Sequence, residues 1–319
     1  MAGSGSTKVV VAALGANGLI AVAKFVAASI TGSAAMLSEA LHSVADTANQ
    51  GLLLFGMRRA RRPADARHPF GYGKELYFWS FVVAILLFSM GAGVSLYEGV
   101  QKLRHPHPIE NAIVNYVVLG VAIVIELIST FVALREFNLQ RGSMSPLTAL
   151  KSSKDPALFT VVLEDLAALA GLVIALIGNL VADLGGWLAG DAIASIAIGC
   201  VLAGVAAFMS RETKSLLIGE SASSELVQGV RTLIESEAAA TGAIQRIHAI
   251  RTMHLGPQDV LLTVRIDFDD GVSAARVEGI VGGLERVIKA RYPEIRQLFL
   301  ATAGERPAAS DAGGPSSAA

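Results

Sequence analysis

Two small groups of ionisable side chains stand inside long apolar stretches of the sequence. The first contains His42 and Asp46, which are four residues apart. On a helix this spacing places both side chains on one face with neighbouring tips. An imidazole nitrogen and a carboxylate oxygen placed in this way can share one divalent ion, and this donor set suits zinc, cobalt, nickel or iron better than calcium or magnesium.

The second group is the adjacent pair Glu164 and Asp165. Two neighbouring carboxylates in an apolar segment resist being ionised together unless a cation or a proton lies between them. We therefore expect His42, Asp46 and Asp165 to form one metal site, with Glu164 as a further ligand or a proton carrier. The alternative is a cluster of shared protons or hydrogen bonds between helices, without metal.

Three further polar residues in apolar stretches are candidates for accessory roles. Glu126 fits either a proton relay or an ion pair with Lys24. Lys24 lies near the end of its apolar stretch, where its ammonium group can also reach the membrane surface by snorkelling. Gln50 continues the polar face of His42 and Asp46, and it fits either an ion path or helix packing.

These side chains need membrane-spanning helices to position them, and the composition supports such helices. Hydrophobic residues make up 53% of the chain and charged residues 17%, with a mean hydropathy of +0.54. An ordinary soluble domain has about 25% charged residues. Because a spanning helix needs about 20 mostly apolar residues, we predict an α-helical membrane protein with six transmembrane helices, at residues 9–30, 34–57, 76–101, 112–134, 157–182 and 189–209.

The charge distribution indicates the class of partner and the orientation in the membrane. A formal net charge of -1 argues against nucleic acid as a partner, and the single Cys200 excludes an intramolecular disulfide or a CxxC site. Basic residues crowd the connections after the second, fourth and sixth predicted helices: Arg58, Arg59, Arg61, Arg62, Arg67, Lys74, Arg135, Arg141, Lys151, Lys154, Arg211 and Lys214. The positive-inside rule then places both termini in the cytoplasm, and the Ala-rich composition fits a bacterial inner membrane. The first residues do not have the pattern of a removable signal peptide.

The sequence changes character after the sixth predicted helix, so we divide it into a transport domain (1–214), a cytoplasmic domain (215–302) and a disordered tail (303–319). Amphipathic helices are expected at 223–238 and 273–291, and strands at 244–254, 260–267 and 296–301. This α-β-β-α-β order predicts a small α+β domain of the ferredoxin or metallochaperone type. A domain of this size is marginally stable alone.

The residues SEALHSVAD (38–46), the six predicted helices and the α-β-β-α-β domain together resemble the cation diffusion facilitator family. The resemblance implies a transporter, typically a homodimer, that moves zinc or related divalent ions against protons. It also implies a His/Asp-x-x-x-Asp pair in the second helix, here His42 and Asp46, facing a second pair in the fifth. Aligning Asp165 with the second aspartate places Val161 where common zinc transporters have histidine.

Five stretches are similar to the zinc transporter 9-like branch of this family: HSVADTANQGLLLFG (42–56), HPFGYG (68–73), MGAGVSLYEGV (90–100), HPHPIE (105–110) and DPALFTVVLEDLAALAGLVIA (155–175). That branch also has Glu-Asp in the fifth helix. The similarity implies Zn²⁺ export by proton exchange, with Zn²⁺ as the transported substrate. Export of manganese, cobalt, nickel or iron is the first alternative. A non-transporting metal-responsive scaffold and an intramembrane metalloenzyme with Glu164 as general base are more distant ones, and we expect no enzymatic activity.

Two other metal sites of the family match this sequence only in part. In the loop after the second helix, Asp65 and His68 fit an Asp-x-x-His-x-x-x-His arrangement, but Tyr72 replaces the second histidine. A loop-fixing turn is the alternative role for these residues. In the small domain, His248 matches one family ligand, whereas Phe299 stands near the expected C-terminal histidine. We therefore expect His248 and His254 on the strand surface, and a domain that serves dimerisation.

Overall fold

The computed structural model describes residues 2–31, 34–105, 112–187 and 189–302. The predicted disordered tail (303–319) and most of the HPHPIE motif lie outside the described residues, as does the side chain of His42. The contacts within the chain define two units, Met1–Ile218 and Gly219–Ala319. Each unit is described by itself below.

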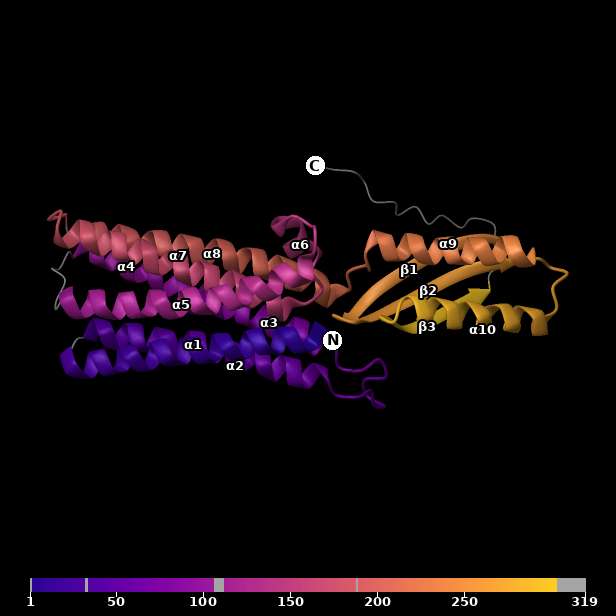
Figure 1. Cartoon of the computed structure of the whole chain (residues 1–319), viewed down its shortest axis with the longest axis horizontal. Helices are drawn as coiled ribbons and strands as arrows, with labels where there is room; N and C mark the ends of the chain where they lie inside the picture. The colour runs from indigo at the N-terminus through magenta and orange to yellow at the C-terminus, as the bar shows by residue number, and fades with distance from the viewer. Residues whose placement is uncertain (1, 32–33, 106–111, 188, 303–319) are drawn as a thin grey trace. The chain divides into compact units, whose positions relative to one another are not determined.

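The first unit consists of helices, most of which run side by side along its length (Figure 1). They are α1 (Ala2–Thr31), α2 (Ala34–Ala60), α3 (Glu75–Leu86), a π-helical segment (Leu87–Gly93), α4 (Val94–Arg104), α5 (Ala112–Arg141), α6 (Pro146–Ser152), α7 (Pro156–Asp183) and α8 (Ala189–Ile218). The third predicted span is therefore a composite of α3, the π-helical segment and α4.

Five stretches of the described residues are long and apolar enough to cross a membrane: Gly5–Ile30, Glu75–Arg104, Ile113–Arg141, Pro156–Asp183 and Ala189–Ile218. The remaining predicted span, at residues 34–57, corresponds to α2, which is a 27-residue helix packed along α1 and α3. Polar side chains such as Asp46, Asn49 and Gln50, together with its basic end, make α2 less apolar than the other five. These helices build a multi-pass membrane protein, in which α2 remains a predicted span.

Several helices are longer than the predicted spans at their basic ends. α5 continues to Arg141, and α8 continues to Ile218, past the predicted domain boundary at 214. The predicted spans end where the apolar residues end. Lys, Arg and Glu are good helix formers, so the helices continue through these residues. The short helix α6 was not predicted, although Ser145 caps it by accepting a hydrogen bond from the Thr148 backbone N–H at 3.3 Å.

Glycines allow α4 and α8 to approach each other closely. A Cβ atom added to Gly99 would lie 2.9 Å from the backbone nitrogen of Ile196, and one added to Gly199 would lie 3.0 Å from that of Leu96. Because backbone atoms cannot move aside as a flexible side chain can, these two positions require glycine. Small residues at such crossings are typical of helices that pack in a membrane.

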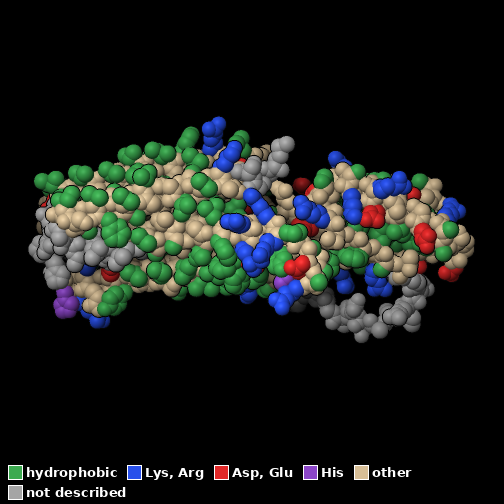
Figure 2. All heavy atoms as spheres, turned by 90° about the horizontal axis from the view of Figure 1, so that it is seen from below, with side chains coloured by type: hydrophobic (Ala, Val, Ile, Leu, Met, Phe, Trp, Pro, Cys, Tyr) green, Lys and Arg blue, Asp and Glu red, His purple; other side chains and the backbone are tan. Residues whose placement is uncertain are grey.

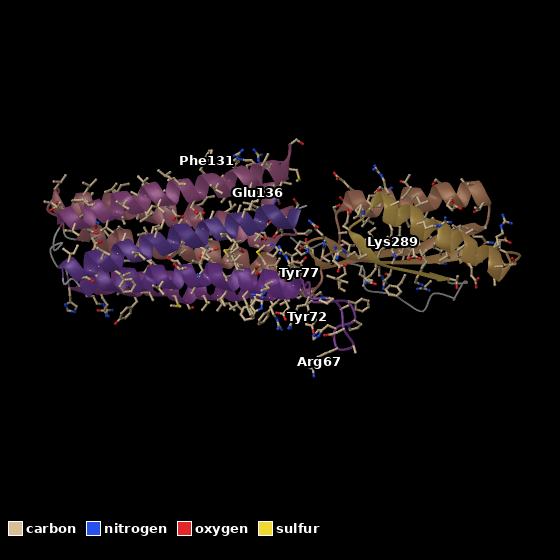
Figure 3. The ribbon with its side chains drawn as sticks, turned by 60° about the horizontal axis from the view of Figure 1, so that its bottom comes forward. Arg67, Tyr72, Tyr77, Phe131, Glu136 and Lys289 are labelled. Atoms are coloured by element: carbon tan, nitrogen blue, oxygen red, sulfur yellow. The ribbon has the colours of Figure 1, made fainter. Side chains whose placement is uncertain are left out.

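The outside of the first unit is mainly apolar, as expected for a surface in contact with lipid. Large hydrophobic side chains of α1 and α5 are exposed, among them Leu19 (62%) and Phe131 (67%), and Phe131 projects outward in Figure 3. In Figure 2, hydrophobic side chains cover the visible side of the helical unit, and most of its Lys and Arg side chains lie at one end of the helices. The core beneath contains apolar residues such as Leu53, Leu158 and Val161.

The second unit has the predicted α-β-β-α-β order. Its sheet has the order β1 (Ile244–Gly256), β2 (Asp259–Phe268) and β3 (Ile295–Thr302), with β1 antiparallel and β3 parallel to β2. Helices α9 (Ser224–Thr241) and α10 (Ala274–Arg291) pack on the face of β2 that carries Val260, Leu262, Val264 and Ile266. The alternation of buried and less buried residues along β2 follows from this one-sided packing.

Candidate functional site

Glu164 lies in the first third of α7 and is held by two amides of α2. Its side chain is 5% exposed. Gln50 Nε2 donates a hydrogen bond to Glu164 Oε2 at 2.7 Å, and Asn49 Nδ2 donates one to Oε1 at 3.3 Å. Both carboxylate oxygens therefore accept hydrogen bonds from α2. The predicted accessory residue Gln50 contacts the predicted ligand Glu164 directly.

Asp165, the next residue, points toward a different helix. Its side chain is 2% exposed, and its Oδ2 accepts a hydrogen bond from Ser129 Oγ of α5 at 2.8 Å. Successive residues of an α-helix are rotated by about 100° around its axis. The adjacent carboxylates consequently reach opposite neighbours, with Glu164 directed to α2 and Asp165 to α5.

Glu126 lies on α5, three residues before Ser129, and so belongs to the same helix face. Its side chain is 1% exposed. It interacts electrostatically with Asp165, Asp46 and Lys24. Among the described residues its Oε1 atom has no hydrogen-bond partner. A carboxylate oxygen buried in this way needs a proton or a cation, because burial removes it from water.

Asp46 completes the group from α2. It is half-buried and precedes Asn49 and Gln50 by three and four residues, so the three side chains share one face of the helix. Asp46 interacts electrostatically with both Glu164 and Glu126. The structure thus brings together six residues predicted for this site from four helices: Asp46, Gln50, Glu126, Glu164, Asp165 and Lys24.

The arrangement concentrates carboxyl groups in the interior of the helical unit, where an ionised carboxylate is costly. Four carboxyl groups interact with one another inside the helical unit, and Lys24 opposes the charge of Glu126. Among the described side chains, no three His, Cys, Asp or Glu residues are close enough to hold a metal ion in this conformation. The predicted ligand His42 lies one turn from Asp46 on α2, and its side chain is outside that set.

Ser129 and Asn49 were not predicted as contacts of the acidic residues. Each follows an acidic residue of the site by three positions on the same helix, Ser129 after Glu126 and Asn49 after Asp46. Polar residues at this spacing in an apolar helix indicate one polar face. The sequence spacing therefore indicated that Ser129 and Asn49 lie on the polar faces of their helices, although it did not indicate which helix each one contacts.

The loop after α2 is fixed by Asp65. Asp65 Oδ1 accepts hydrogen bonds from the His68 and Arg67 backbone N–H groups at 2.7 and 3.0 Å, and the Tyr72 hydroxyl donates to Oδ2 at 2.7 Å. The Tyr72 hydroxyl is the main cause that holds the pKa of Asp65 below its usual value. The His68 and Tyr72 rings lie 4.3 Å apart, and Figure 3 shows Tyr72 and Arg67 in this loop. These contacts support a loop-fixing role for Asp65 and His68.

The two histidines of the small unit differ from each other. His248 Nε2 lies 3.7 Å from Asp267 Oδ2 on the neighbouring strand, and this pair is partly exposed. His254 was predicted on the strand surface, but it is 6% exposed and its Nδ1 lies 3.3 Å from the Gly256 carbonyl oxygen. The prediction for His254 was wrong because the residue pairs with Val260, on the sheet face that the helices cover.

Residues 10–218 match the family model of the cation efflux transmembrane domain. The chain is similar to a human protein named proton-coupled zinc antiporter SLC30A9, mitochondrial, with 34% identity over 94% of this chain and 53% of the relative. It is 31% identical to metal tolerance protein C4 of Arabidopsis thaliana, over 83% of this chain and 57% of that protein. The magnetosome protein MamB of Magnetospira is 24% identical over 88% of this chain and 89% of its own length.

The chain spans about half the length of the first two relatives. The match to the cation efflux model covers nearly the whole helical unit and more than half of the chain. The family description, cation efflux, and the name of the human relative, an antiporter, describe transport across a membrane and not an enzymatic reaction. The chain therefore belongs to the cation efflux family, also called the cation diffusion facilitators.

Proposed function

We propose that this protein exports Zn²⁺ in exchange for protons. The observation that carries the proposal is the group of four carboxylates, Asp46, Glu126, Glu164 and Asp165, on three helices of the membrane unit. Buried carboxylates are costly in a membrane and mark ion or proton sites. The name of the human relative, a proton-coupled zinc antiporter, supports the same substrate and counter-ion.

The exchange follows from the acid-base chemistry of the proposed ligands. A metal ion binds deprotonated carboxylates and neutral imidazole, so Zn²⁺ binding at Asp46, Asp165 and His42 displaces protons. Rocking of the helices around the site then opens it to the other side of the membrane. There, protonation of the same groups releases the ion. His42 is suited to this step because an unperturbed imidazole has a pKa of about 6.5.

The test is metal-driven proton flux in proteoliposomes that contain a pH-sensitive dye. Asp46→Ala and Asp165→Ala are expected to abolish both Zn²⁺ uptake and the coupled pH change. Glu136→Gln is a matched control, because Glu136 lies near the basic end of α5 and contacts Gln140, outside the acidic group. Full proton flux in the Asp165→Ala protein would contradict the site assignment.

A harder cation such as Mn²⁺ is the second candidate, because α7 contains no histidine that could add a second imidazole donor to that of His42. Val161, where common zinc transporters have histidine, is apolar and 0% exposed, so it supplies no nitrogen donor. Carboxylates suit manganese, whereas imidazole suits zinc, cobalt, nickel and iron. Uptake should be compared for Zn²⁺, Mn²⁺, Co²⁺, Ni²⁺ and Fe²⁺. We expect His42→Asp to shift the preference toward Mn²⁺.

We further propose that the protein lies in a bacterial inner membrane with both termini in the cytoplasm. The support is the group of Lys and Arg side chains at one end of the helical unit (Figure 2), the end at which the connections after α2 and α5 lie (Figure 1). In a Cys200→Ala background, Lys8→Cys and Ser221→Cys should react with a membrane-impermeant maleimide only after the cells are opened. Labelling of either cysteine in intact cells would contradict this orientation.

We also propose that the small unit joins two copies of the chain. Helices α9 and α10 cover one face of its sheet, while Phe299 on β3 is 51% exposed. Full-length protein in detergent should have the mass of a dimer in light scattering. A monomeric mass at micromolar concentration would exclude this role. His248→Ala should leave the number of bound zinc ions unchanged, since a dimerisation unit needs no metal.

A further inference from the structure

We propose that Glu126 of α5 is a direct ligand of the transported ion, together with His42, Asp46 and Asp165, and that Glu164 instead holds α2 to α7. This assignment rests on the transport function proposed above. It differs from the pattern expected from the sequence, in which Glu164 is a ligand and Glu126 an accessory residue. It also adds a third helix, α5, to a site expected between α2 and α7.

The site needs a further donor. Zinc in proteins is most often held by four ligands in a tetrahedron. His42, Asp46 and Asp165 provide three side chains. Val161 lies one turn before Asp165 on α7, is fully buried in the apolar core and has no donor atom. A fourth side chain with a free donor atom would complete such a set.

Glu164 is poorly placed to be this donor. Both of its oxygens already accept hydrogen bonds from Gln50 and Asn49. Turning Glu164 toward a metal ion would leave these two buried amides without their acceptor, which is unfavourable. The two hydrogen bonds instead give Glu164 a positioning role between α2 and α7.

Glu126 meets the requirements that Glu164 does not. It is 1% exposed, and its Oε1 is not engaged by any donor within the described part of the chain. Ser129, one turn away on the same face of α5, is hydrogen-bonded to Asp165, so this face is directed at the site. The electrostatic interactions of Glu126 with Asp165 and Asp46 place it in the same group of charges.

Glu126 and Asp46 are also displaced along their helices in the same direction. With a rise of about 1.5 Å per residue, Glu126 lies ~4.5 Å beyond Ser129, and Asp46 lies ~6 Å beyond Gln50, away from the basic ends of both helices. Ser129 and Gln50 contact the adjacent residues Asp165 and Glu164. Glu126 and Asp46 therefore lie at similar depths on either side of α7.

Lys24 does not remove the need for a cation. It interacts electrostatically with Glu126 from α1. One ammonium group set against the carboxylates of Glu126, Asp46 and Asp165 leaves a net negative charge when all three are ionised. A divalent cation neutralises that charge, and a carboxylate with an unengaged oxygen is the natural ligand for it.

The first experiment measures equilibrium Zn²⁺ binding by the full-length protein in detergent at fixed pH. Glu126→Gln is expected to raise the dissociation constant at least tenfold, and Glu126→Asp less. Glu136→Gln is the control on the same helix and should bind as the wild type does. An unchanged dissociation constant in Glu126→Gln, with reduced proton flux, would identify Glu126 as a proton relay and overturn the assignment.

The second experiment observes the ligand itself. In a Cys200→Ala background, the protein has no thiol, so Glu126→Cys introduces the only one. If residue 126 faces the ion, X-ray absorption at the zinc edge should show a sulfur neighbour at about 2.3 Å. Glu126→His should instead add imidazole scattering. Zinc bound without sulfur in the cysteine variant and without added imidazole in the histidine variant would overturn the proposal.

The wild type and Asp165→Ala separate this proposal from the proposed function. If Asp165→Ala loses Zn²⁺ binding while Glu126→Gln retains it, only the role of Glu126 fails. If the wild type binds and transports none of the five metals, the transport function fails as well. Loss of binding in both variants, with wild-type thermal stability and a zinc–sulfur contact in Glu126→Cys, supports both.

Discussion

The amide of Gln50 donates a hydrogen bond to the carboxylate of Glu164 at 2.7 Å, joining α2 to α7 inside the helical unit. Gln50 is fully buried and Glu164 nearly so. α2 otherwise packs mainly along α1 and α3. This polar contact therefore makes a specific connection between the two helices that carry the predicted metal ligands.

Replacing Gln50 by alanine should destabilise the protein. The change leaves Glu164 Oε2 buried without its donor, at a cost of about 1–3 kcal/mol. Thermal unfolding of the purified protein in detergent should show a lower midpoint, while Gln140→Ala, at the exposed end of α5, should not. The exchange Gln50→Glu with Glu164→Gln keeps one amide and one carboxylate and should restore much of the loss. Equal midpoints for Gln50→Ala and the wild type would show that this contact contributes nothing.

Ser129 should support metal binding through Asp165. Removing a hydrogen bond to a metal ligand typically weakens metal affinity by about 10–100-fold. We expect Ser129→Ala to weaken Zn²⁺ binding within this range, and Ser129→Thr, which keeps the hydroxyl, to bind nearly as the wild type does. Calorimetric titration would measure both. A threonine variant as weak as the alanine variant would mean that side-chain size, rather than the hydroxyl, is responsible.

Gly99→Ala should weaken the packing of α4 against α8. The added Cβ would meet the backbone of Ile196, and overpacking of this kind costs about 1–3 kcal/mol. Gly120→Ala on α5 is the matched control, because a Cβ there has no atom within 4 Å. The thermal midpoint should fall for the first variant and stay the same or rise for the second. A fall of similar size in both would point to a general effect of losing glycine.

The loop after α2 should depend on pH through Asp65. Its hydrogen bonds from the Tyr72 hydroxyl and the His68 backbone lower the pKa of Asp65. A lowered pKa in the folded state means that the ionised form stabilises the loop above the unfolded pKa of about 3.9. This contribution is lost as the pH falls through the lower, folded value. The loop should thus be intact at neutral pH and loosen only in acid.

Tyr72→Phe tests the cause of this shift. It removes the largest contribution, so the pKa of Asp65 should rise toward its usual value and the loop should loosen at a higher pH. The carbon-13 shift of the Asp65 carboxyl, followed by NMR against pH, would measure the change. An unchanged titration midpoint would show that the backbone contacts alone control Asp65.

Much of the architecture could be predicted because apolar runs and alternation are local signals. The segment that became β2 alternates from Val260 to Ile266, and its burial in the structure alternates in the same way. The pair His42 and Asp46 likewise identified the face of α2 on which Asn49 and Gln50 lie. Helix ends were less predictable, because charged residues such as Arg135 and Glu136 end the apolar run but do not stop the helix.

The contacts between helices could not be predicted, because they depend on packing across long distances in the sequence. Gln50 and Glu164 are 114 residues apart, and Ser129 and Asp165 are 36 apart. The sequence shows that Glu164 and Asp165 are adjacent, but not that they contact different helices. His254 illustrates the same limit, since its burial depends on which sheet face receives α9 and α10.

The π-helical segment at Leu87–Gly93 has a consequence for the length tolerance of its span. Its backbone hydrogen bonds run from residue i to residue i+5, so its turns are wider and the segment holds one residue more than an α-helix would need there. The segment therefore joins α3 to α4 and sets which face of α4 is directed at α8. Deleting one residue within it would therefore turn the segment into ordinary α-helix and leave Gly99 directed at α8, whereas deleting one residue of α4 before Gly99 would rotate Gly99 by about 100°, away from Ile196.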